Sequence, residues 1–139
     1  MEVVILDQPE RSAHVAADAI AALLARTPTA VLGLATGSSP LAVYDELADR
    51  CARGDVSFAS ARGFTLDEYV GLPVDHPERY RTVIDRDFVS RVDFAAGAVS
   101  GPDGLASDIA QACTDYEQAI ADAGGVDLQI LGIGSDGHI

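Results

Sequence analysis

The chain of 139 residues contains no lysine and no tryptophan, and its nine cations are all arginines. The missing lysine excludes a Walker-type phosphate loop and a Schiff-base lysine within these residues. A net charge of −13 argues against a nucleic-acid partner, which needs clustered cations. No basic-then-apolar leader opens the chain, and no apolar run approaches the ~20 residues of a membrane span. We therefore expect a cytoplasmic protein with no membrane partner.

Cysteine and histidine are also scarce. Cys51 and Cys113 fall in separate helical patterns, and we expect both to be small buried apolar side chains in a reducing compartment. His14 and His76 lie in unrelated contexts, and the chain has neither an H-x-x-x-H spacing nor a Cys/His cluster. We therefore predict no metal site.

Short apolar runs alternate with amphipathic helical patterns along the whole chain. This alternation predicts an α/β fold, a doubly wound and mostly parallel sheet with flanking helices in a Rossmann-like three-layer arrangement. An acceptor at Asp7, a proline at Pro9 and an acid at Glu10 predict Asp7 as the N-cap of the first helix. The expected strands cover residues 3–6, 30–35, 63–66, 98–100 and 126–131, and the expected helices cover residues 8–27, 40–53, 79–88 and 109–123.

Three polar loops follow expected strands, where sheets of this kind form their sites. The first loop contains Thr36, Gly37, Ser38 and Ser39, whose hydroxyls and backbone N–H groups at a helix N-terminus could bind an oxyanion or a phosphate. The same residues are equally typical of a serine N-cap before Pro40. The residue types alone leave both interpretations open.

The second loop begins with Asp67-Glu68 directly after a strand. A carboxylate placed there could abstract a proton, and the apolar residues on both sides would desolvate it and raise its pKa. Paired acids also occur as ordinary solvated loop charge.

The third loop, residues 132–139, satisfies the G-x-G-x-x-G spacing of a dinucleotide-binding turn, which also requires a following helix and a later acid. It carries Asp136 two residues before His138, an imidazole that a nearby acid could orient. A purely structural hydrogen bond between these two side chains is a third interpretation.

Taken together, the three loops resemble the glucosamine-6-phosphate deaminase (glucosamine/galactosamine-6-phosphate isomerase) family. Residues 34–40 are similar to the phosphate loop of that family, residues 64–73 to its catalytic aspartate segment, and residues 131–139 to its histidine loop. The final loop is shared with the related 6-phosphogluconolactonases. Lactonases usually have an arginine after Asp-Glu, whereas this chain has Tyr69. The order and spacing match along the chain.

The resemblance implies conversion of glucosamine 6-phosphate to fructose 6-phosphate and ammonia, as in amino-sugar catabolism, without a metal or organic cofactor. The sugar phosphate would bind at Thr36, Gly37, Ser38 and Ser39. Asp67 would move the C2 proton, and His138, oriented by Asp136, would assist ring opening. A homo-oligomer is possible within such a family. The alternatives are a 6-phosphogluconolactonase-type hydrolase and a non-catalytic sugar-phosphate-binding module.

Members of that family are longer than this chain. The resemblance therefore implies a single incomplete domain over residues 1–139, the N-terminal half of a deaminase, with weak activity or none by itself. We also expect the last strand to carry an exposed apolar face or edge, because later segments would normally cover it.

Overall fold

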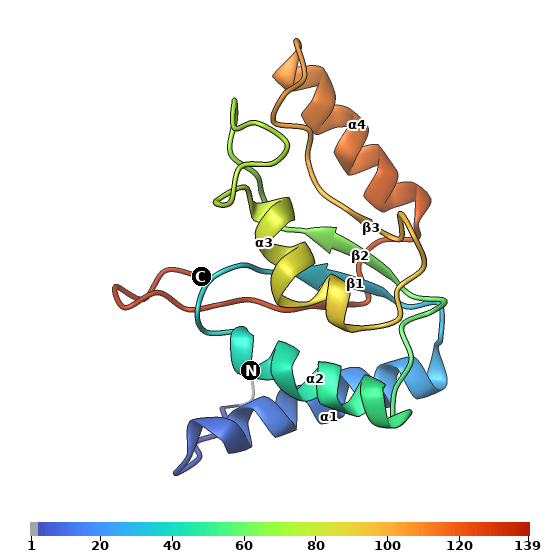
Figure 1. The fold of residues 1–139 in the computed structure, drawn as a ribbon, viewed down its shortest axis with the longest axis vertical. Coiled ribbons are helices and arrows are strands. Elements are labelled where there is room, and N and C mark those ends of the chain that lie inside the picture. Colours follow the sequence, from blue (N-terminus) through green and yellow to red (C-terminus); the bar gives the residue numbers. More distant parts are fainter. Residues whose placement is uncertain (1–2) are drawn as a thin grey trace.

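The computed structural model describes residues 3–139, and it confirms the α/β prediction. Four parallel strands form one sheet in the order β3-β2-β1-β4, flanked by helices (Figure 1). The strands are β1 (Val31–Leu34), β2 (Arg62–Thr65), β3 (Val99–Ser100) and β4 (Leu128–Gln129). The helices are α1 (Pro9–Arg26), α2 (Leu41–Arg53), α3 (Tyr80–Asp87), the short 3-10 helix η1 (Val89–Arg91) and α4 (Ile109–Asp122).

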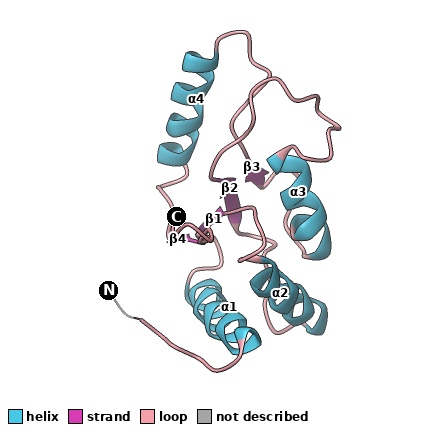
Figure 2. Ribbon diagram, turned by 90° about the vertical axis from the view of Figure 1, so that its left-hand side faces the viewer, coloured by secondary structure: helices cyan, strands magenta, loops and turns pink. Residues whose placement is uncertain are grey.

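The strand order produces a topological switch point between β1 and β4. The chain first moves outward, from β1 through α2 to β2 and through α3 to β3, and then returns through α4 to pair β4 with the other side of β1. Because crossovers between parallel strands are right-handed, the two directions place their helices on opposite faces. Figure 2 shows α2 and α3 on one side of the sheet and α4 on the other.

The core lies between the sheet and the layer formed by α1, α2 and α3. Tyr44 stacks on Phe88 at 4.6 Å between ring centroids, and Phe58 meets Phe88 edge-on at 5.4 Å. On the opposite face α4 buries no side chain completely. Leu131 and Ile133, just beyond β4, are 50% and 65% exposed, which confirms the expected apolar exposure at this edge.

Two expectations about the start of the chain are wrong. Residues 3–6 form no strand and are largely exposed, because no strand of the described residues lies beside them to complete a ladder. The N-cap of α1 is Gln8 rather than Asp7, and Asp7 instead accepts a hydrogen bond from Arg11 at 2.9 Å. In the described part of the chain no helix is long and apolar enough to cross a membrane.

The expectation for the cysteines is wrong in part. Cys113 is exposed on α4, a helix that buries no side chain completely against the sheet. Cys51 is half-buried. The Cys51 thiol donates to Asp93 at 3.3 Å, and burial raises the pKa of that thiol.

Tyr44 fixes the end of β1, where the first candidate loop begins. Its hydroxyl donates to the Ala35 carbonyl at 2.7 Å and accepts from the Ala35 N–H at 3.1 Å, and the side chain is only 1% exposed. Burial raises the pKa of this phenol. One helical side chain therefore satisfies both backbone groups of the residue that leaves the sheet.

Replacing Tyr44 with phenylalanine leaves the Ala35 N–H and C=O buried without this partner, and we expect a loss of about 1–3 kcal/mol in the free energy of unfolding. Urea denaturation measures the loss. Tyr69→Phe removes a hydroxyl from a half-exposed ring and should cost less than about 0.5 kcal/mol. Equal losses in the two variants would contradict the assigned role of Tyr44.

Candidate active site

A cavity of about 350 Å³ lies at the switch point, beside the ends of β1, β2 and β4. All three loops that the sequence singles out contribute to its wall. The lining residues are Ala35, Thr36, Gly37, Ser38, Ser39, Leu66, Asp67, Leu131, Gly132, Ile133, Gly134, His138 and Ile139. Open parallel sheets bind ligands in this position, outside the carboxyl ends of strands where the strand order reverses.

The loop from Thr36 to Ser39 connects β1 to α2 and does not cap the helix. Pro40 occupies the N-cap position of α2, and no side chain caps it, so the serine-cap interpretation is wrong. The Ser39 hydroxyl instead accepts a hydrogen bond from the Ile133 N–H at 3.2 Å. Ser39 thereby joins the first loop to the third one across the switch point.

Asp67 follows β2 and reaches the cavity with an exposed carboxylate. Partial desolvation, together with the negative charge of Glu68, raises the pKa of Asp67 above its ordinary value of 3.8. The direction agrees with the sequence-based expectation, although Leu66 and Val70 are themselves 53% and 67% exposed. The apolar surroundings of Asp67 are therefore looser than the sequence suggested.

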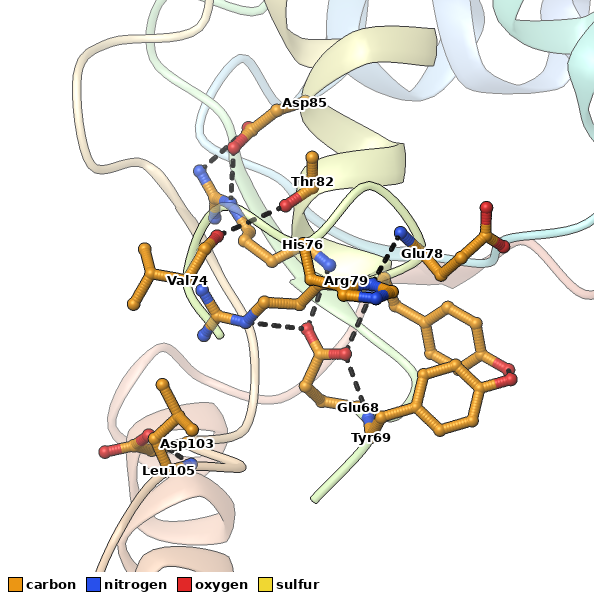
Figure 3. Close-up of polar contacts among 12 residues, drawn as sticks. Glu68, Tyr69, Val74, His76, Glu78, Arg79, Thr82, Asp85, Asp103 and Leu105 are labelled. Atoms are coloured by element: carbon orange, nitrogen blue, oxygen red, sulfur yellow. Dashed lines mark hydrogen bonds and ion pairs between the residues drawn. The ribbon is translucent and has the colours of Figure 1, made fainter. Parts of the chain in front are cut away.

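Glu68 lies in a different environment, which the sequence did not reveal. Its side chain is only 2% exposed and points to the start of α3 (Figure 3). It accepts hydrogen bonds from the backbone N–H groups of Tyr69 and Tyr80, both at 2.9 Å, and of Arg81 at 3.0 Å. The Arg79 guanidinium lies 3.5 Å away. The helix cap therefore comes from a residue distant in sequence.

A second set of contacts fixes the same loop to the turn after β3. The Gly71 N–H donates to the Gly104 carbonyl at 2.8 Å, and a side chain at Gly104 would collide with the Tyr69 carbonyl. The rings of Tyr69 and Tyr80 lie 4.6 Å apart, and the Tyr80 hydroxyl donates to that of Tyr69 at 3.1 Å. This hydrogen bond, with burial, raises the pKa of Tyr80 to about 12.

The third loop folds back on itself. The Gly134 N–H donates to the His138 carbonyl at 2.8 Å, and Gly137 has φ +85°, which favours glycine. The Asp136 carboxylate lies 2.5 Å from His138 Nδ1, and this contact lowers the pKa of Asp136. Asp136 does not line the cavity itself, whereas His138 does.

Among residues 3–139 no arginine lines the cavity, so backbone N–H groups, hydroxyls and the His138 imidazole are the donors available there to an anion. Within residues 3–139 no group of three or more histidine, cysteine, aspartate or glutamate side chains could hold a metal ion.

Curated relatives cover the whole of the chain. A glucosamine-6-phosphate deaminase of Mycolicibacterium smegmatis is 73% identical over 139 residues, which are all of this chain and 53% of that protein. A glucosamine-6-phosphate deaminase of Beutenbergia cavernae is 71% identical with the same coverage. The chain thus spans about half the length of these relatives.

Solved structures share the fold. A monomeric glucosamine-6-phosphate deaminase superposes with a TM-score of 0.94 at 35% identity, over 100% of this chain and 58% of that one. A 6-phosphogluconolactonase of Thermotoga maritima superposes with a TM-score of 0.80 at 28% identity, over 99% of this chain and 61% of that one. The similarity includes all four strands, since it extends over almost every residue.

A family model described as glucosamine-6-phosphate isomerases/6-phosphogluconolactonase matches residues 8–139, which include all three loops of the cavity. The chain therefore belongs to the glucosamine-6-phosphate isomerase/6-phosphogluconolactonase family.

Proposed function

We propose that the protein to which these residues belong converts glucosamine 6-phosphate and water to fructose 6-phosphate and ammonia. The observation that carries the proposal is the convergence of a carboxylate, an imidazole and a hydroxyl-rich loop on one cavity at the switch point. Proton transfer between adjacent carbons needs a positioned base and a proton donor, and a carboxylate and an imidazole supply both.

Asp67 is the proposed base. It would remove the C2 proton of the ring-open aldose while the C1 oxygen takes up a proton, which gives an enolamine. Return of the C2 proton to C1, with loss of a proton from the amino nitrogen, would leave a ketimine at C2. Water would then add to the ketimine, and ammonia would leave from the tetrahedral carbon to give the ketose. The raised pKa of Asp67 suits this role, because a stronger base accepts the C2 proton more readily.

His138 is the proposed donor and acceptor for ring opening, which moves a proton between the C1 hydroxyl and the ring oxygen. Asp136 contacts Nδ1 at 2.5 Å and leaves Nε2 as the nitrogen that can meet the sugar. A carboxylate at Nδ1 also stabilises the charged imidazolium that forms when His138 takes up a proton. Asp136 would thus act through His138.

The phosphate would bind at Thr36 to Ser39, next to the start of α2. Because no side chain caps α2, its first N–H groups remain available to an anion, and the helix dipole favours negative charge there. The chain has a net charge of −13 and no arginine in the cavity wall. We therefore expect these 139 residues alone to bind sugar phosphates weakly and to turn them over slowly or not at all.

The deaminase is favoured over the lactonase by the relatives. The proteins that are 61–73% identical are named deaminases, whereas the lactonase structure is 28% identical. Tyr69 follows Asp-Glu where lactonases usually have an arginine. A non-catalytic module would not need to retain Asp67 and His138 together in the cavity wall.

A direct test uses an extended protein, in which residues 1–139 are followed by the part of the Mycolicibacterium smegmatis deaminase that this chain does not span. We expect ammonia release from glucosamine 6-phosphate, coupled to formation of fructose 6-phosphate. The same preparation should not hydrolyse 6-phosphogluconolactone faster than the buffer does. Consumption of the lactone without ammonia release from the amino sugar would favour the alternative hydrolase.

The base role of Asp67 is tested in the extended protein by Asp67→Asn. Because asparagine cannot accept the proton, we expect exchange of the C2 hydrogen with deuterated solvent to slow by about 10²–10⁴-fold. The inhibition constant of inorganic phosphate should change less than about twofold, since the phosphate loop is untouched. Asp75→Asn, an exposed acid in the same segment, is the matched control. Exchange at the normal rate in Asp67→Asn would remove Asp67 from this role.

A further inference from the structure

We infer that Glu68 is the positioning residue of this site, which holds Asp67 in the cavity by fixing the loop after β2 to the start of α3. This assignment rests on the proposed function, because it gives Glu68 a part in the reaction that Asp67 carries.

The contacts of Glu68 exclude a direct catalytic role. Oε1 accepts from the N–H groups of Tyr69 and Tyr80, and Oε2 accepts from that of Arg81 and faces the Arg79 guanidinium (Figure 3). A carboxylate offers about four lone-pair sites, and each is used here. With a side chain only 2% exposed, Glu68 has no direction left from which to meet a substrate.

The same contacts let Glu68 fix the position of Asp67. On one side of Asp67 the Leu66 N–H donates to the Leu34 carbonyl at 3.1 Å, which extends the β1–β2 ladder. On the other side the Tyr69 N–H donates to the Glu68 carboxylate at 2.9 Å, and this second anchor lies nearer to Asp67 than the backbone bond from Gly71 to Gly104. Asp67 is thus held between the sheet and α3, and loss of the second anchor would free the carboxylate to move relative to His138.

Burial of a negative charge is tolerable here because positive groups surround it. Arg79 and the N-terminal end of α3 both favour a carboxylate at this position. The charge also acts on Asp67. The charged and titratable groups around Asp67 are Glu68 on its own loop, Tyr80 on α3, His138 across the cavity, and Cys113, Tyr116 and Glu117 on α4. Of these Glu68 contributes to its raised pKa.

The test is Glu68→Gln in the extended protein, with Glu78→Gln as the matched control. Glu78 is an exposed glutamate two residues before α3. The glutamine amide would place an NH2 group where Oε2 now accepts, against the Arg81 N–H and the Arg79 guanidinium. A displacement of about 1 Å at the base costs up to about 10²-fold. We therefore expect kcat to fall by about 10–10²-fold, while KM changes less than about threefold.

The pH profile separates this role from a general loss of structure. Removing the Glu68 charge removes one of the two causes that raise the pKa of Asp67, so the acid limb of kcat should move to lower pH. In Glu78→Gln the acid limb of kcat should stay at the same pH as in the unsubstituted protein. A kcat and an acid limb in Glu68→Gln that both equal those of the control would overturn the inference, even if Asp67→Asn abolishes turnover.

If Glu68→Gln does not fold, Arg79→Gln provides the same test with less disturbance of the fold. It removes the guanidinium from Oε2 and leaves the three backbone bonds. We expect about a threefold decrease in kcat and faster hydrogen exchange at the Tyr69 and Tyr80 amides, with KM unchanged. Normal exchange at both amides, together with normal kcat, would contradict the inference. The amide measurement needs no turnover, so it separates this inference from the proposed reaction.

Discussion

Pairing of β1 on both sides is the constraint on which the site depends. β1 pairs with β2 over four residues and with β4 over two, and all three strands run parallel. Asp127 strengthens the shorter side, because its carboxylate accepts from the Val31 N–H at 2.8 Å. Parallel strands end at the same edge, and the strand order reverses between β1 and β4, where sheets of this kind leave a crevice. A cavity results between the loops that follow β1 and β4, and Asp67 reaches it from β2.

Asp67 and Glu68 follow β2 one after the other, and we assign their carboxylates two different roles. Both residues lie in the loop after β2, but their surroundings differ. Asp67 lines the cavity and is exposed, whereas the Glu68 side chain turns to α3 and is almost completely buried. The proposed role of Asp67 needs Glu68, since a base on a loop has a defined position only if the loop backbone is itself held.

The sequence predicted the parts of the structure that depend on local pattern. Alternating strand and helix periods gave the fold class, and the rule that sites form at strand ends brought Thr36, Asp67 and His138 to one edge. The remaining features depend on partners distant in the chain. The Glu68 cap on α3 and the Ser39 bond to Ile133 join segments that no local pattern connects. Residues 3–6 have the composition of a strand, but a strand also requires a neighbour.

The lack of available cations limits how tightly this cavity can bind a phosphate. Most arginines of the chain are engaged elsewhere, as when Arg50 pairs with both Asp18 and Glu46 to join α1 to α2. Arg79 and Arg81, at the start of α3, pair with Glu68 and Asp85. Releasing Arg79 to a ligand would take away the guanidinium that faces the buried Glu68 carboxylate. We therefore expect the cations that bind the phosphate to come from the part of the longer relatives that this chain does not span.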